Sequence, residues 1–433
     1  MVNEAIYKEE KMNSIILDKI IVKHSRVDYF FSIKGNLQKY FKTSNHMFLE
    51  YNYDLSDIPN SILAIPFVAN VVPLIWITDS TIVIKELDQS FYVCLNNIKN
   101  AYQNMFPNVK FMGSIVVDKI VENTYIPRLE AASLFSGGLD ALTTFIRIKD
   151  KKPLLVTEYG WHEDGIESSN VWDADKENVI NFAKDNGLEN ILIQSNYGTF
   201  IIAGNVDHDF RNKLEDTWCH GLHHGLAIIS AAIPIAFKLK IKCIYIASSN
   251  SPLYQVTCAS DPTVDNEIKY ASGEVFHDGY ELTRQDKVKV VVDHYSTNKE
   301  SVNIRVCFKN EENCCKCEKC LRTIMGIIAE GKDPREYGFN IPNNLFQYVK
   351  TSLNNEVKFF TNTFIVMYWN LIQVRMKQNY TYILDKDLLD WFLDYDFKAQ
   401  RRKALLKYRV TKFFPILKRK IRIKVNAILK QNN

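Results

Sequence analysis

The segment from Ala131 to Ile148 constrains the fold of this chain more than any other stretch. Ala131 to Phe135 is a short apolar run, which suits a buried parallel strand. Gly137 and Gly138 follow, and glycines let the backbone turn sharply and approach a ligand without Cβ atoms in the way. Leu139 to Ile148 then has a helical pattern, and the N-terminal N–H groups of a helix attract anions. The segment predicts a strand, a phosphate-binding loop and a helix, although a Gly-Gly turn without a ligand would have the same residues.

Two side chains of this loop can add chemistry to the backbone. Ser136 offers a hydroxyl donor, and Asp140 offers a carboxylate that can hold Mg²⁺ or orient the loop. The pattern is not a Walker loop, which requires the sequence GxxxxGK[ST].

The loop resembles the SGGxDS pyrophosphate loop of the PP-loop ATP pyrophosphatases, which cleave ATP between its α- and β-phosphates and usually attach AMP to an oxygen of the substrate. Ala141 stands where that family usually has Ser or Thr, and the missing hydroxyl costs about one hydrogen bond, on the order of 1 kcal/mol. The resemblance implies that Ser136 and Asp140 are catalytic. It also implies that ATP and Mg²⁺ are bound by Phe135, Ser136, Gly137, Gly138, Leu139 and Asp140.

A cysteine cluster lies far downstream of the loop. Cys307, Cys314, Cys317 and Cys320 have the spacing C-x6-C-x2-C-x2-C, and thiolates two residues apart can close on one tetrahedral ion. We expect structural Zn²⁺, with an iron–sulfur cluster and free thiols as the alternatives. Cys315 is expected to be a bystander, although it could replace Cys314. Four of the other five cysteines are scattered, which argues against a disulfide framework and for a reducing compartment.

The combination of loop and cluster resembles 7-cyano-7-deazaguanine synthase over about residues 130–330. The phrases Arg305–Cys307 and Asn313–Thr323 are more similar to those of uncharacterised PP-loop proteins from surface-polysaccharide or defence gene clusters. The resemblance implies an ATP-dependent ligase or amidating enzyme that forms AMP and pyrophosphate. It would adenylylate a carboxylate or amide oxygen of a small-molecule acceptor, and a nitrogen nucleophile would displace AMP. The alternatives are a nucleotide-binding adaptor with weak catalysis and an enzyme that modifies tRNA or its bases.

Alternating strands and helices after Ala131 predict an α/β fold with a parallel, Rossmann-like nucleotide-binding sheet. We expect three domains: a β-rich N-terminal domain over 1–127, the ATP-binding domain with its zinc-binding lobe over 128–340, and a helical, basic region over 341–433. In the first domain, the uncharged run Ser61 to Thr78 contains two prolines, so two buried strands joined at Asn70 fit better than a membrane helix.

Further candidate residues lie near the expected carboxyl ends of the strands, where such sheets bind ligands. Asp164 could hold a ribose, a metal or a substrate amine, or it could belong to a solvated loop. Ser248 could contact a polar ligand or cap a turn. Arg284 and Lys287 are two cations about one helical turn apart, and they could neutralise phosphate or form surface ion pairs.

The segment Cys219–His224 offers several pairings on a helix. At i,i+4 spacing, Cys219 pairs with His223 and His220 pairs with His224, which could create a second metal site. We expect instead that one histidine, His224, lines a substrate pocket, and the alternative is a packed or solvated histidine. Spacing alone supports no Ser-His-Asp arrangement.

Charge is unevenly distributed along the 433 residues. Net charge is +4, but residues 401–433 contain 12 of the 54 basic residues and no acidic ones, which leaves 42 basic against 50 acidic residues elsewhere. The basic tail could bind a membrane surface or RNA, or fold over the protein itself. No secretory signal is visible, so we expect a cytoplasmic protein, with a peripheral location at the inner membrane face through this tail as the alternative. A homodimer is compatible with this interpretation.

Overall fold

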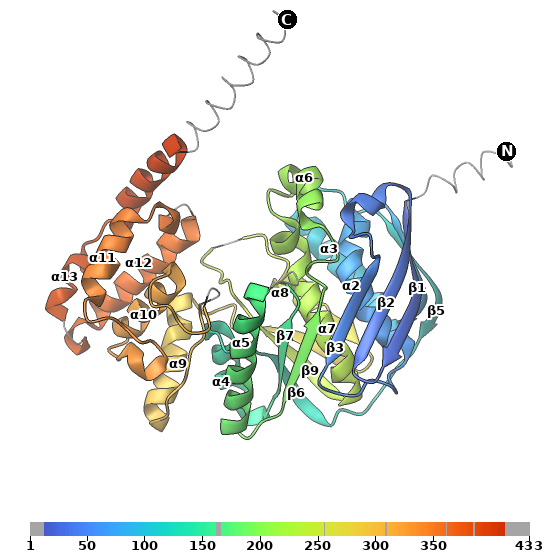
Figure 1. The fold of residues 1–433 in the computed structure, drawn as a ribbon, viewed down its shortest axis with the longest axis horizontal. Coiled ribbons are helices and arrows are strands. Elements are labelled where there is room, and N and C mark those ends of the chain that lie inside the picture. The colour runs from blue at the N-terminus through green and yellow to red at the C-terminus, as the bar shows by residue number, and fades with distance from the viewer. Residues whose placement is uncertain are drawn as a thin grey trace, which may run out of the picture. The chain divides into compact units, whose positions relative to one another are not determined.

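The computed structural model describes residues 13–161, 166–254, 256–307, 310–360, 362–383 and 386–411. The chain forms two compact units, Met1–Thr283 and Arg284–Asn433. The first unit is α/β and the second is helical (Figure 1).

The first unit is built on one eleven-stranded sheet. Its strand order is β10-β11-β9-β6-β7-β8-β3-β2-β1-β4-β5. In chain order the strands are β1 Ser14–Lys23, β2 Arg26–Lys34, β3 His46–Tyr51, β4 Thr81–Asp88, β5 Ser114–Val121, β6 Leu129–Leu134, β7 Leu154–Tyr159, β8 Asn190–Ser195, β9 Ile241–Ala247, β10 Lys269–Tyr270 and β11 Gly273–Asp278.

The strands β11, β9, β6, β7 and β8 form a continuous parallel block. The chain runs outward from β6 to β7 and β8, and then returns to form β9 on the other side of β6. The strand order therefore reverses between β6 and β9. In open parallel sheets, such a reversal leaves a crevice at the carboxyl ends of the two strands, where ligands bind.

Helices connect and cover these strands. In the first unit they are α2 Asn60–Ile77, α3 Gln89–Met105, α4 Leu139–Ile148, α5 Ile166–Asp185, α6 Ala203–Leu214, α7 His224–Lys238 and α8 Pro262–Asp265, with the 3-10 turns η1 Gly35–Tyr40 and η2 Lys149–Lys151 and the π-helical turn η3 Cys219–His223. The helix α4 packs on β6 and β9, α5 packs on β7 and β8, and α7 packs on β9 and on α2 (Figure 1).

The helix α2 corrects the expectation of two strands joined at Asn70. All its residues after Asn60 are buried. A helix that is apolar on every side has no helical periodicity in its sequence, so it cannot be told from buried strands by pattern. Pro66 and Pro73 both lie inside it. Among the described residues, two helical stretches, Asn60–Ile77 and Cys219–Lys238, are long and apolar enough to span a membrane. The apolar 18-residue windows in them are 94% and 78% buried inside the protein.

The N-terminal region is not a separate β-rich domain ending at residue 127. The strand β3 pairs antiparallel with β8, with Leu49 opposite Ser195 and Tyr51 opposite Ile193, so this region extends the sheet of the parallel block. It also contributes α2 and α3. The pairing joins segments more than 140 residues apart, and local sequence patterns do not report such pairing. The compact units divide at 283/284 rather than at 127 and 340.

The second unit contains the cysteine cluster and a helical bundle. Its helices are α9 Arg284–Asn298, α10 Glu318–Ala329, α11 Leu345–Asn355, α12 Thr363–Gln378 and α13 Asp390–Leu393, with the 3-10 turns η4 Pro334–Tyr337, η5 Val357–Phe360, η6 Tyr380–Tyr382 and η7 Lys386–Leu388. Trp369, Phe392 and Phe397 form an aromatic core. Residues 397–411 are helical, and the remainder of the basic tail lies outside the described residues.

Candidate functional site

The loop between β6 and α4 has the backbone that the sequence predicted. Gly137 has φ +70°, in the left-handed region that favours glycine. Gly138 is extended, with φ −79° and ψ 168°, and its carbonyl accepts the first helical hydrogen bond, from the N–H of Leu142, at 2.9 Å. Gly138 is the N-cap residue of α4, and as a glycine it has no side chain that could cap the helix. The N-terminus of α4 thus follows directly on the carboxyl end of β6, at the point where strand order reverses.

The side chains of this loop fall into two groups. Phe135 and Leu139 are buried and anchor the loop, so any contact they make with a ligand would involve their backbone. Ser136 is exposed and Asp140 is partly exposed. The hydroxyl of Ser136 accepts a long hydrogen bond of 3.4 Å from the N–H of Gly138. Ala141 is 5% exposed.

Glu158, at the end of the neighbouring strand β7, was missed by sequence reasoning. The hydroxyl of Tyr197 donates to its Oε2 at 3.0 Å. Its buried Oε1 has no hydrogen-bond partner within the described part of the chain. Burial raises the pKa of this carboxyl well above its ordinary value, against the hydrogen bond from Tyr197, which lowers it. Carboxyls with raised pKa at ligand-binding edges are candidates for proton transfer or ligand binding. The sequence did contain one signal for Glu158, because an acidic residue stands near the end of an otherwise apolar strand.

The other predicted residues have separate outcomes. Ser248 is 1% exposed, and its hydroxyl donates to the carbonyl of Asn250 at 3.0 Å, which matches the turn-capping alternative. Asp164 lies outside the described residues. Arg284 begins α9 and Lys287 lies one turn later, with 2% of its surface exposed. Both belong to the second unit, and their contact with phosphate stays a prediction.

The histidine segment does not follow regular helical spacing. Cys219–His223 forms a π-helical turn, in which the N–H of His224 donates to the carbonyl of Cys219. This turn separates Cys219 from His223, whose ring instead lies against Asn70 with Nε2 and Oδ1 2.8 Å apart. His220 and His224 do come together, with ring centroids 6.2 Å apart. His224 is partly exposed, and its Nδ1 donates to the carbonyl of Cys219 at 3.1 Å.

Four cysteines of the second unit form a candidate metal centre. The Sγ atoms of Cys307, Cys314, Cys317 and Cys320 all lie within 4.8 Å of one another. Sulfurs at the corners of a tetrahedral zinc–thiolate site, with Zn–S bonds of about 2.3 Å, are about 3.8 Å apart, and the Sγ atoms of Cys314 and Cys320 are 3.8 Å apart. The cluster therefore fits one metal ion of zinc's size, with thiolate ligands.

The backbone around the cluster is arranged to hold these ligands. Cys317 is the N-cap of α10, and its N–H donates to the Sγ of Cys314 at 3.3 Å. Asn313 accepts from the N–H of Cys307 and donates to the carbonyls of Ile304 and Gly338. This side chain thus holds together the two segments that carry the ligands.

Cys315, the fifth cysteine of this region, does not belong to the cluster, as expected. Its Sγ donates to the carbonyl of Asn313 at 3.4 Å. Its φ of +51° provides the turn between Cys314 and Cys317.

The close packing of the sulfurs shifts the pKa values of Cys317 and Cys320 in opposite directions. The hydrogen bond from Cys320 lowers the pKa of Cys317 to about 5, while the same bond raises the pKa of Cys320. Burial raises the pKa of Cys314. Metal ligation requires the sulfurs as thiolates, so binding a metal ion would release the protons that they still carry.

Comparison of the chain with protein-family models, curated proteins and solved structures found no match. Its function is therefore inferred from its own residues and their geometry.

Proposed function

We propose that this chain is an ATP-dependent adenylylating enzyme of the PP-loop class, which forms AMP and pyrophosphate and acts on a carboxylate or amide acceptor. The single observation that carries the proposal is the left-handed Gly137 before the N-terminus of α4, at the reversal of strand order between β6 and β9. Numbered in chain order within the parallel block, the strands have the order 3-2-1-4-5, which is that of doubly wound nucleotide-binding folds.

The residues of the loop would each have a distinct role. Backbone N–H groups at the start of α4 and the exposed hydroxyl of Ser136 would bind the pyrophosphate as negative charge develops on it. Asp140, in the first turn of α4, would serve Mg²⁺ or the geometry of the loop. Glu158, with its buried carboxyl, is a further candidate for proton transfer.

The cysteine cluster would have a structural role in this enzyme. Structural zinc sites contribute folding energy and keep no open coordination position, and four thiolates from Cys307, Cys314, Cys317 and Cys320 would complete such a site. We therefore assign Zn²⁺ to the stability of the second unit and give it no part in the reaction.

Product analysis tests the proposal. The zinc-loaded protein is incubated with α-labelled ATP, Mg²⁺ and a pool of small carboxylates and amides, and the labelled products are separated. We expect labelled AMP or an adenylylated acceptor, together with pyrophosphate. Labelled ADP with inorganic phosphate would refute the assignment, because it means cleavage between the β- and γ-phosphates.

Ala141 favours a second candidate function, a nucleotide-binding adaptor with little catalysis. The residue lies buried at the start of α4, and its methyl side chain supplies no hydroxyl to the loop. An adaptor would bind Mg·ATP in calorimetry but would release no pyrophosphate with any acceptor. Its biological effect would survive Asp140→Ala, whereas that of an enzyme would not.

A further inference from the structure

A second group of reactive side chains lies away from the loop of α4. Cys258 belongs to the segment after β9, and His220 and His224 belong to the π-helical turn and the start of α7. The residue after Cys258 is bonded to this segment, because the N–H of Ala259 donates to the carbonyl of His220 at 2.6 Å, and this places Cys258 beside His220. The Nδ1 of His220 is 2.8 Å from the Oδ2 of Asp216, and that oxygen also accepts from the hydroxyl of Thr257 at 2.8 Å.

The hydrogen bonds determine which ring atoms face the sulfur. The Nδ1–H of His220 donates to the carboxylate of Asp216, and the Nδ1–H of His224 donates to the carbonyl of Cys219. In each ring this leaves Nε2 as the nitrogen that can bond to the sulfur of Cys258. A neutral thiol has one proton and can satisfy only one of the two nitrogens. A thiolate can accept from both, provided that the rings are protonated.

Charge balance supports the ionised arrangement. The carboxylate of Asp216 and a thiolate at Cys258 would be offset by two imidazolium rings. Burial raises the pKa of Cys258, but the hydrogen bonds from His220 and His224 outweigh it and lower the pKa to about 6. The hydrogen bonds to Asp216 and Cys258 raise the pKa of His220 to about 10. Burial instead raises the pKa of Cys219 to about 11.

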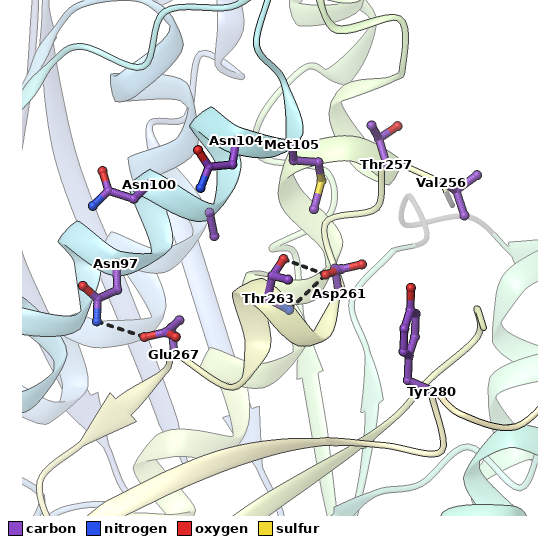
Figure 2. A pocket seen from close by; sticks show the side chains of 11 residues that line it. Asn97, Asn100, Asn104, Met105, Val256, Thr257, Asp261, Thr263, Glu267 and Tyr280 are labelled. Carbon is purple, nitrogen blue, oxygen red and sulfur yellow. Dashed lines mark hydrogen bonds between the residues drawn. The ribbon is translucent and has the colours of Figure 1, made fainter. Parts of the chain in front are cut away.

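A polar pocket adjoins this group (Figure 2). It has a volume of about 830 Å³, and Val256 and Thr257, directly before Cys258, lie in its wall. Asn97, Asn100 and Asn104 project into it from one face of α3. The acidic side chains of the wall are Asp261 and Glu267, and the described lining contains no Lys or Arg. The lining suits a ligand rich in hydroxyl or amine groups and disfavours a phosphate.

We propose that Cys258, His220 and Asp216 form a second reactive centre, which accepts an acyl group from an ester or amide of a hydroxyl- or amine-bearing compound seated in this pocket. A nucleophile within hydrogen-bond reach of a base, which a third group orients, is the usual signature of covalent acyl transfer. Asp216 is a positioning residue, because it acts through His220. The centre is independent of the proposed ATP chemistry.

The reaction has two balanced steps. The thiolate of Cys258 attacks the carbonyl carbon, the C–S bond forms, and the C–O or C–N bond breaks. The leaving alcohol or amine takes a proton from Nε2 of His220. Water, or an amine, then attacks the thioester and gives a proton back to His220, which releases the acyl product and restores the thiolate. No oxidant or reductant is needed.

Cysteine labelling tests the thiolate. The zinc-loaded protein is treated with limiting chloroacetamide at pH 7, and the modified cysteines are identified by peptide mass spectrometry. We expect Cys258 to react at least about tenfold faster than Cys219, because its larger thiolate fraction outweighs its lower intrinsic nucleophilicity. Since Cys258 is only 4% exposed, equal or slower labelling would show that the sulfur is merely packed and would overturn the proposal.

Acyl transfer is tested with p-nitrophenyl acetate as the probe. We expect a burst of nitrophenolate and one acetyl group on Cys258, both lost in Cys258→Ser. Alkylation of Cys258 without acetylation would overturn the acyl-transfer step. A second bound metal equivalent that disappears in Cys258→Ser would overturn the whole proposal in favour of a metal site.

Matched variants separate the role of His220 from a general effect on folding. We expect His220→Gln to slow labelling of Cys258 at least about tenfold. His208 is the control, because it is exposed and is likewise paired with an aspartate, Asp209, at 2.9 Å. His208→Gln should leave labelling unchanged. For the positioning role, Asp216→Asn should slow labelling and Asp216→Glu should restore part of it, with unchanged melting temperatures. If His220→Gln melts early, the rate order of Cys258 and Cys219 in the unmodified chain remains decisive.

Discussion

The ring of His223 and the side-chain amide of Asn70 share a buried hydrogen bond across 153 residues of sequence, with Nε2 and Oδ1 2.8 Å apart. The amide oxygen can only accept, so Nε2 of His223 donates. The amide nitrogen of Asn70 donates in turn to the carbonyl of Pro66 at 2.8 Å. Trp218 stacks on the histidine ring, with centroids 5.0 Å apart. This contact links the interior of α2 to the π-helical turn before α7.

Removing the side-chain amide of Asn70 should destabilise the folded protein. We expect Asn70→Leu to lower the free energy of unfolding by about 1–3 kcal/mol, because it leaves the N–H of His223 buried without its acceptor. Asn186 is the control, since its amide also donates to the carbonyl four residues earlier, Phe182, but it is exposed. Asn186→Leu should change the free energy by less than about 0.5 kcal/mol. Urea unfolding measures both, and equal effects would contradict the importance of the buried bond.

His223 should also make the protein sensitive to acid. Burial lowers its pKa from the ordinary 6.5 to about 3. The folded state keeps the ring neutral while the unfolded state gains a proton, so stability is lost as pH falls from about 6.5 towards 3, by up to about 1.4 kcal/mol per pH unit. His220 differs, because its pKa is raised from 6.5 to about 10, so its contribution is fully present below about pH 6.5 and is lost as pH rises from there through about 10.

The measurement is the free energy of unfolding at several pH values between 7 and 4. His223→Gln keeps a donor for Asn70 but cannot titrate, so its stability should fall less steeply with acid. Equal slopes for the two proteins would contradict the assignment.

If the cysteine cluster binds a metal ion, we expect opposite results for substitutions at Cys317 and at Cys315. Cys317→Ser should abolish stoichiometric zinc and lower the melting temperature of the second unit, because it removes a ligand at the N-cap of α10. Cys315→Ser should keep the zinc, because that sulfur bonds the carbonyl of Asn313 instead. Metal analysis and calorimetry of both variants and of chelator-treated protein measure this. An iron content in place of zinc would identify the alternative cluster.

Two glycines with similar backbone conformation test the nucleotide loop. Gly137 has φ +70° and Gly187, after α5, has φ +64°. An alanine at either site costs about 1–2 kcal/mol of backbone strain. Space is not limiting at Gly187, where an added Cβ would contact nothing within 4 Å. We expect Gly137→Ala to abolish the heat of Mg·ATP binding in calorimetry and Gly187→Ala to preserve it. Loss in both variants would point to a general loss of stability.

Ala141 tests whether the loop is weakened. Ala141→Ser restores the hydroxyl usual in the PP-loop family, and one added hydrogen bond of about 1 kcal/mol should tighten Mg·ATP binding about fivefold. Ala141→Val is the control for filling the buried space without a donor, and it should not tighten binding. Unchanged affinity in Ala141→Ser would mean that the position does not face the nucleotide.

Local signals predicted the glycine turn before α4 and the clustering of the four cysteines. Gly137 and Gly138 lie between β6 and α4 as expected, because a glycine pair between an apolar run and a helical pattern is a strong local signal. The four cysteines converge as their spacing indicated. The role of Cys315 was predicted as well, since a turn between ligand pairs leaves one sulfur outside the cluster.

Local sequence signals could not predict the second reactive centre that we propose. Cys258 and His220 are 38 residues apart, and no spacing rule connects them. The π-helical turn at Cys219–His223 also changes which ring faces which partner. Glu158 was missed because its unusual character comes from burial, and the burial of its carboxyl depends on Tyr197 and the strands around it.

The sequence by itself determined the elements whose chemistry is local: the glycine turn before α4, the alternation of strands and helices after Ala131, and the four cysteines of the cluster. Only the tertiary structure decided that α2 is a helix, that β3 joins β8 in one sheet, and that the segment of Cys258 lies beside His220. The physical reason is that backbone conformation and ligand spacing are encoded by neighbouring residues. Burial, strand pairing and the pKa values that follow from them depend on residues that meet only when the chain has folded.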